Sequence, residues 1–138
     1  MPELSQVAVG DELPELRVRI TRSGVVRYSG ASTDFNEIHF SDRHARAIGL
    51  PGVVAHGMWT MGAGLRVVTD WLGDPALVVS YFVRFTRPVL VPDDDDGAEV
   101  VYRATVAAVT ETGARITLTA TCGDDVVLGA ARAEVRLG

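Results

Sequence analysis

The stretch GMWTMGAGLRVVTDWL, residues 57–72, has the apolar spacing of a long α-helix and decides the fold class. The residues that we expect on its buried face recur every three or four positions: Met58, Met61, Gly62, Leu65, Val68 and Leu72. Glycine is a poor helix former, but on a buried face it lets a neighbouring sheet come close. We therefore predict a long helix packed inside a curved sheet and stopped by Gly73-Asp74-Pro75.

The chain after this helix has the pattern of β-strands. Four segments, 76–87, 98–110, 114–122 and 126–137, are rich in β-branched residues, often in alternation with polar ones. A fifth strand is predicted at 13–20, and two shorter helices are predicted to follow the caps Thr21 and Ser41 or Asp42. Short turns join consecutive strands, which favours antiparallel pairing. The predicted fold is α+β, with about five antiparallel strands on one face of the long helix.

Composition limits the class of protein. The length of 138 residues suits a single domain over residues 1–138, and the net charge of −5 argues against nucleic acid as a partner. No apolar window is long enough to cross a membrane, and the N-terminus lacks the pattern of a secretory signal. The single cysteine, Cys122, cannot form an internal disulfide. We expect a cytoplasmic protein.

A carboxylate and an imidazole lie five positions apart in the polar segment before the long helix. Asp34 and His39 either shape a loop, with Asn36 in an Asx turn, or form an acid–base pair in which each group handles one proton. Adding water to an enoyl thioester requires such a pair, and the pKa of histidine suits it. Asn36 could hold the loop or the water.

The start of the long helix offers a group for the other half of that chemistry. The backbone N–H of Gly57 lies where a helix dipole stabilises negative charge on a thioester oxygen, although the glycine could equally serve close packing. Met58 beside it is predicted to contact the substrate. His56 has the same predicted role, but a buried histidine bonded to backbone is the more common case.

Metal binding has little support in the sequence, and we predict no metal and no cofactor. Asp34 and Asn36 begin like a calcium loop, but Ile38 stands where an oxygen ligand is needed. The three histidines, His39, His44 and His56, contain no helical pair of zinc ligands.

These segments together resemble a known family. YSGASTDFNEIHFSDRHA (28–45), VAHGMWTMG (54–62), DWLGDP (70–75) and VRFTRPVLVPDD (83–94) are similar to the MaoC-like (R)-specific enoyl-thioester hydratases. Within that family they most resemble the B subunits of mycobacterial-type (3R)-hydroxyacyl-acyl-carrier-protein dehydratases. The resemblance implies a hot-dog fold, in which a curved antiparallel sheet wraps a long central helix. It also implies a lyase of fatty-acid metabolism that uses Asp34, His39 and the Gly57 N–H as catalytic groups.

The resemblance further implies a substrate and a partner. The substrate would be a thioester of coenzyme A or of acyl carrier protein. The partner would be a second hot-dog subunit, in a homodimer or in a heterodimer with a related chain. Because both carriers bring phosphate, candidate contacts are four arginines: Arg43, Arg46, Arg84 and Arg87.

Two residues depart from the family pattern. Thr33 replaces a glycine and would be strained if its φ were positive, and Glu37 replaces a proline and adds a carboxylate near Asp34. A hot-dog thioesterase and a non-catalytic acyl-binding subunit are the alternatives. The first normally carries a carboxylate on the central helix, where this chain has only Asp70 near the end. The presence of both Asp34 and His39 argues against the second.

Overall fold

The computed structural model describes residues 1–138 and contains one five-stranded antiparallel sheet in the order β1-β3-β4-β5-β2. The strands are β1 (Leu16–Ile20), β2 (Val78–Phe85), β3 (Ala98–Val109), β4 (Gly113–Cys122) and β5 (Asp125–Arg136). The α-helices are α1 (Arg22–Ser32), α2 (Asp42–Ala47) and α3 (Gly57–Leu72). Three short 3-10 helices are η1 (Leu4–Gln6), η2 (Glu37–His39) and η3 (Pro75–Leu77). The predicted bounds of the long helix are confirmed.

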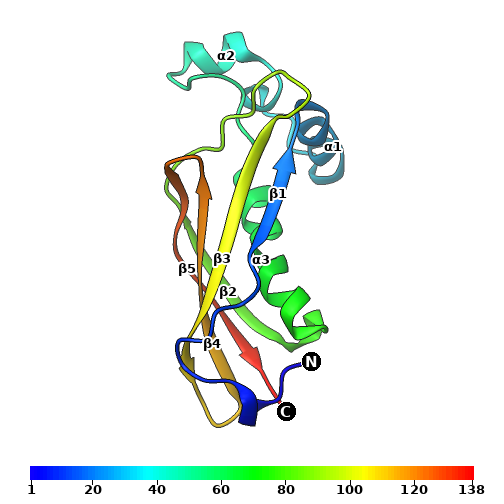
Figure 1. Ribbon diagram of the computed structural model, residues 1–138. Coiled ribbons are helices and arrows are strands. Elements are labelled where there is room, and N and C mark those ends of the chain that lie inside the picture. Colours follow the sequence, from blue (N-terminus) through cyan, green and yellow to red (C-terminus); the bar gives the residue numbers. More distant parts are fainter.

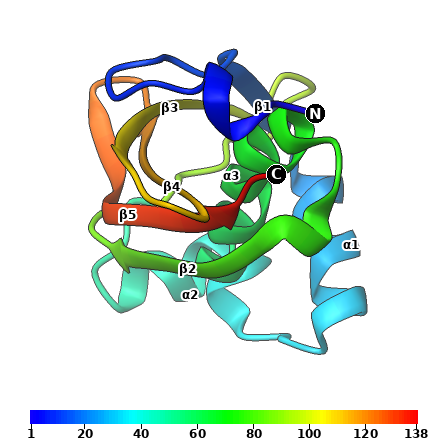
Figure 2. The same cartoon turned by 90° about the horizontal axis from the view of Figure 1, so that it is seen from below.

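The sheet curls around α3, which contacts all five strands (Figures 1 and 2). Val68 and Leu72 of the helix are fully buried, as are Tyr102 and Ile116 of the facing strands. This arrangement is a hot-dog fold, as predicted. The helices α1 and α2 lie at one end of the elongated sheet, and both chain termini lie at the other end (Figure 1).

The predicted inner face of α3 was wrong in its first half. Met58 and Gly62 are exposed, and the buried positions are Thr60, Gly64, Val67, Val68 and Leu72. The helix carries apolar or small residues on most of its circumference, so the spacing alone could not choose between adjacent stripes. The second half of the predicted face, Val68 and Leu72, is confirmed.

Gly64 is where the sheet comes closest to α3. A Cβ atom at this position would lie 2.8 Å from Cε1 of Tyr102 and 3.1 Å from the hydroxyl of Tyr81. The same two side chains hold the helix: Tyr102 donates its hydroxyl to the Thr60 carbonyl at 2.8 Å, and Tyr81 donates to the Met61 carbonyl at 2.9 Å. Burial raises the pKa of Tyr81 to about 12 and also raises the pKa of Tyr102, so both hydroxyls keep their protons.

The two edges of the sheet differ in character. β1 has only five residues, and its Arg17 forms ion pairs with Glu15 and Glu99, which covers that edge with charge. β2 is longer and exposes the apolar side chains Val79, Phe82 and Phe85. The β2 edge is therefore the one that is open to a further strand.

A strap outside the sheet fixes the segment before α3. The Ala55 N–H donates to the Val89 carbonyl, and the Val91 N–H donates to the Val53 carbonyl, both at 2.9 Å. Segments 53–55 and 89–91 therefore pair like a short β-ladder and position the first turn of α3.

None of the three α-helices combines the length and apolar composition of a membrane span.

Candidate active site

Asp34 stands directly after α1, at a tight reversal of the chain. Thr33 ends the helix with φ 62° and ψ 14°, so the positive φ that would strain this threonine is present. The Asp34 N–H donates to the Ser32 hydroxyl at 3.2 Å, and the Asp34 Oδ1 accepts from the Asn36 N–H at 3.1 Å. One carboxylate oxygen thus shapes the loop, while Oδ2 remains free to face the site.

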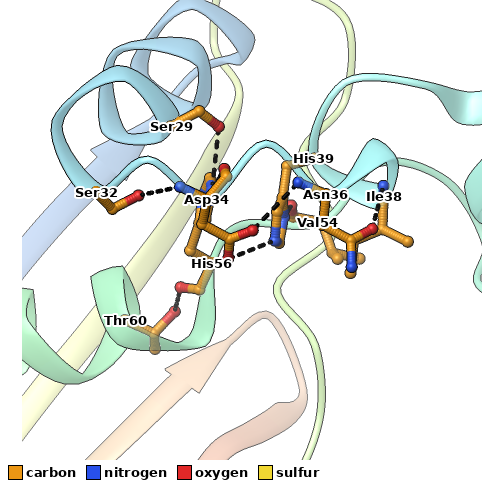
Figure 3. A network of polar contacts seen from close by, with 9 residues as sticks. All are labelled: Ser29, Ser32, Asp34, Asn36, Ile38, His39, Val54, His56 and Thr60. Carbon is orange, nitrogen blue, oxygen red and sulfur yellow. Dashed lines mark hydrogen bonds and ion pairs between the residues drawn. The ribbon is translucent and has the colours of Figure 1, made fainter.

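His39 lies at the end of η2 and is 6% exposed. Its Nδ1 lies 2.7 Å from the Val54 carbonyl oxygen, and a carbonyl can only accept. Nδ1 therefore carries the proton, and in the neutral ring Nε2 keeps its lone pair. That Nε2 points at Asp34, with 3.7 Å between it and Oδ2 (Figure 3).

Gly57 begins α3 beside this pair. The preceding residue, His56, makes no side-chain cap, so the first N–H groups of the helix receive no bond from that side chain. The ring of Phe85 lies against the glycine, 3.1 Å from where a Cβ atom would be. An exposed aromatic ring therefore borders a helix start that can donate hydrogen bonds to an anion.

Asp34, Asn36, His39 and Gly57, all predicted site residues, line one pocket of about 450 Å³. The other two, His56 and Met58, border an adjoining pocket of about 560 Å³. Asp34, Gly57 and Phe85 line both pockets, so they form the boundary between them.

The residues around the pocket that contains Asp34 and His39 were only partly predicted. Of the four candidate arginines only Arg87 lines it. Phe85 and Thr60 also line it and were not predicted as site residues. The available signal for Phe85 was an aromatic residue that lies between the candidate arginines Arg84 and Arg87 in the sequence. The Val54 carbonyl, which sets the His39 tautomer, leaves no trace in a sequence because every residue has one.

His56 is the most enclosed polar group of the site, with 2% exposure. Its Nε2 lies 3.1 Å from both the Asp34 carbonyl oxygen and the Ser29 hydroxyl (Figure 3). Because the carbonyl can only accept, Nε2 carries the proton, and the buried Nδ1 has no hydrogen-bond partner. Burial lowers the pKa of this imidazole, and the nearby His39 lowers it further. The expectation of a buried, backbone-bonded histidine is confirmed.

The remaining polar residues of the loop have structural contacts. Asn36 accepts the Ile38 N–H on its Oδ1 at 3.2 Å, which is the Asx turn that the sequence allowed. Glu37 lies 2.9 Å from Nδ1 of His44 on α2. The added carboxylate is thus engaged by α2 rather than by the acid–base pair.

The possible metal-ligand atoms of Asp34, His39 and His56, one carboxylate oxygen and two ring nitrogens, lie within 4.8 Å of one another, a spacing that a metal ion could bridge. The ring orientations oppose this. The two imidazoles stack with centroids 3.6 Å apart and planes 21° from parallel, whereas ring nitrogens bind metals along lone pairs that lie in the ring plane. His56 Nε2 is also occupied by the Asp34 carbonyl. This arrangement fits proton transfer better than metal binding.

A family model described as a MaoC like domain matches residues 6–122 of this chain, including the whole site. The chain belongs to the MaoC-like family. This MaoC-like chain is 39% identical over 79 residues to 3-hydroxyacyl-thioester dehydratase X of Mycobacterium tuberculosis, covering 57% of this chain and 27% of that protein. It is 31% identical over 114 residues to 3-hydroxybutyryl-CoA dehydratase of Methylorubrum extorquens, covering 82% and 71%.

Solved structures share the fold. One MaoC-like dehydratase superposes with a TM-score of 0.95 at 34% identity, over 99% of this chain and 42% of that one. The ChsH1-ChsH2 complex from Mycobacterium tuberculosis superposes with a TM-score of 0.80 at 23% identity, over 95% and 98%. This MaoC-like chain therefore spans less than half the length of two of these proteins, the M. tuberculosis dehydratase X and the MaoC-like dehydratase.

Proposed function

We propose that this MaoC-like chain interconverts (3R)-hydroxyacyl and trans-2-enoyl thioesters by eliminating or adding water. One observation carries the proposal: Asp34 Oδ2 and His39 Nε2 face each other at 3.7 Å in a pocket that also contains the start of α3. The gap is too long for a direct hydrogen bond, but a water molecule that lies beside the two atoms, about 2.8 Å from each, can bond to both. The names of the relatives, which include dehydratases of hydroxyacyl thioesters, agree with this chemistry.

The proton steps follow from the tautomer of His39. In the hydration direction the Nε2 lone pair takes one proton from water, while the Asp34 carboxylate holds the other. The water oxygen forms a bond to the β-carbon, and the electrons of the double bond move to the thioester oxygen. The His39 imidazolium then donates its proton to the α-carbon. Water is consumed, no net proton is released, and dehydration is the reverse path.

The start of α3 has the second role in this proposal. Negative charge develops on the thioester oxygen between the two proton transfers. The free N–H of Gly57 and the dipole of a 16-residue helix can stabilise it. An Ala or larger side chain at position 57 would press on the Phe85 ring and narrow the approach.

A partner along β2 belongs to the same proposal. Phe85 at the end of β2 lines both pockets, so a second hot-dog subunit that pairs with the open β2 edge would cover the side of the site. A chain of the ChsH1-ChsH2 complex shares this fold, so a chain of this fold is known in a complex of two proteins. We propose a hot-dog partner, either a second copy or a related chain, and a coenzyme A or carrier-protein thioester as substrate.

The test is loss of the conjugated enoyl absorbance of a short trans-2-enoyl-CoA. Asp34→Asn should reduce turnover by at least about 100-fold, because general acid–base groups contribute about 10² to 10⁴ in rate. Asp70→Asn is the matched control, since Asp70 is exposed near the far end of α3 and lies 3.9 Å from Arg66. Full activity of Asp34→Asn would remove the carboxylate from the reaction.

Release of free thiol, measured in the same samples, tests the thioesterase alternative. Thiol release that depends on Asp70 would replace the lyase proposal, because a hydrolase of this fold normally uses a carboxylate on the central helix. The contact of Asp70 with Arg66, far from the pocket lining, favours the lyase.

A further inference from the structure

We propose that His56 is the positioning residue of this site, an inference that rests on the function proposed above. Its side chain was predicted to bind substrate, but at 2% exposure it offers almost no surface to a ligand. It contacts instead the backbone of Asp34 and the ring of His39, the two residues whose side chains exchange protons with water in the proposed function. We infer that His56 sets the distance between Asp34 and His39 and fixes both relative to Gly57.

The first link runs to Asp34. The His56 Nε2–H donates to the Asp34 carbonyl at 3.1 Å (Figure 3). That carbonyl follows Thr33, whose left-handed backbone is strained for a β-branched residue. A strained turn persists only where its neighbours hold it, and this buried hydrogen bond is well placed to do so. The link thereby fixes the backbone from which the Asp34 carboxylate projects.

The second link runs to His39. The two imidazoles stack at 3.6 Å, and Tyr28 of α1 packs on His56 with ring centroids 4.8 Å apart. The hydrogen bond from His39 Nδ1 to the Val54 carbonyl leaves the ring free to tilt about that contact. Stacking against His56 removes this freedom, so His39 Nε2 keeps its direction toward Asp34.

The third link is covalent. His56 is the residue before Gly57, and its own carbonyl accepts the Thr60 N–H at 3.2 Å, the first bond of α3. The ring is therefore attached to the helix that would carry the oxyanion donor. One side chain connects the base, the carboxylate and the helix start, which come from two separate segments of the chain, the loop at 33–41 and the start of α3.

The ring performs this role in its neutral form. The groups that face it are Tyr28, Ser29, Asp34 and His39, and none of them offers an acceptor to Nδ1. A second proton would place an unpaired N–H in a buried site and a positive charge against His39. Positioning therefore requires a neutral imidazole protonated on Nε2.

Two variants separate the links. His56→Gln keeps an N–H donor near the place of Nε2 and removes the stacked ring, whereas His56→Phe keeps a ring and removes the donor. Misplacing a reacting group by about 1 Å can cost about 100-fold in rate, so we expect kcat to fall by about 10- to 100-fold in each variant. KM should stay near its wild-type value, because the residue does not touch the substrate. Asp70→Asn, at an exposed position near the far end of α3, is the control and should keep wild-type kcat.

Two kinetic outcomes overturn the proposal. A raised KM with unchanged kcat would show that His56 binds substrate, as the sequence had suggested. Unchanged kcat in both variants, with a lowered melting temperature, would show a purely structural role. If Asp34→Asn is inactive and both His56 variants keep wild-type kcat, the role inferred for His56 fails and the proposed function stands. If Asp34→Asn is fully active, the proposed function itself fails.

A measurement on the wild-type chain covers the case in which the variants do not fold. The chain has three histidines, so a long-range ¹H–¹⁵N spectrum contains three imidazole systems. At pH 7 we expect His56 to be neutral with its proton on Nε2, and His39 to carry a proton on Nδ1 when neutral. A proton on Nδ1 of His56, or a charged His56 ring at that pH, would contradict the network of contacts from which the role is inferred.

Discussion

Alanine substitution at two glycines of α3 tests how closely the sheet packs on this helix. Gly62 and Gly64 both lie in the helix interior, and alanine is the better helix former by about 1 kcal/mol. Nothing lies within 4 Å of a Cβ atom placed on Gly62, so Gly62→Ala should gain most of that difference. With about 3 °C per kcal/mol for a chain of this size, its melting temperature should rise by about 2–3 °C.

Gly64→Ala should have the opposite sign. Its Cβ atom would lie 2.8 Å from a ring carbon of Tyr102, and that ring is fully buried with its hydroxyl bonded to Thr60. Overpacking of this kind costs about 1–3 kcal/mol, which exceeds the gain in helix propensity. The two variants should thus differ by about 2 kcal/mol, or about 6 °C in melting temperature.

Thermal unfolding followed by circular dichroism measures both variants under the same conditions. Adding Tyr102→Phe to Gly64→Ala should give a smaller combined loss than the sum of the single changes, because the ring without its hydroxyl bond can move away. Equal shifts for Gly62→Ala and Gly64→Ala would refute the close approach of β3 to the helix.

Three further predictions concern the loop, pH and the partner. Thr33→Gly should stabilise the chain by about 0.5–1 kcal/mol in urea unfolding. A left-handed threonine costs about 1–2 kcal/mol, and glycine loses part of this gain because its unfolded state has more entropy. A destabilised variant would contradict the strain at Thr33. Burial lowers the pKa of His56 in the folded chain below 6.5, so on acidification the unfolded chain binds a proton at this residue at a higher pH than the folded chain does. Stability should therefore fall as pH drops through 6.5, and His56→Gln should lose less stability than the wild type between pH 7.5 and 5. Val79→Lys should convert a β2-paired dimer to monomer in sedimentation, and unchanged sedimentation would place the partner elsewhere.

Local patterns were sufficient for most of the fold. Helical spacing and stop residues located α3 from Gly57 to Leu72, and the Thr21 cap before α1 is confirmed by its bond from the Gly24 N–H. The inner face of α3 was not predictable in the same way. An exposed Met58 and a buried Thr60 depend on where the sheet ends, and that is a tertiary property.

In the candidate site, too, features set by local sequence were predictable and features set by tertiary contacts were not. Asp34 and His39 were identifiable because five positions separate them in one loop, and the geometry brings their side chains to 3.7 Å. The stack of His56 on His39 joins residues from different segments, so no spacing rule reveals it. The positive φ of Thr33 was foreseeable only because the family pattern has glycine at that position.

The hydroxyls of Tyr81 and Tyr102 bond to adjacent carbonyls at the start of α3, and this has a consequence for substrate range. Two anchor points make the first turn of the helix move as one body with β2 and β3. We therefore expect adaptation to short or long acyl groups to come from the exposed ring of Phe85 and from the loop at 33–41. Chains with this anchor can acquire new acyl preferences through changes in those two parts while the helix start keeps its place.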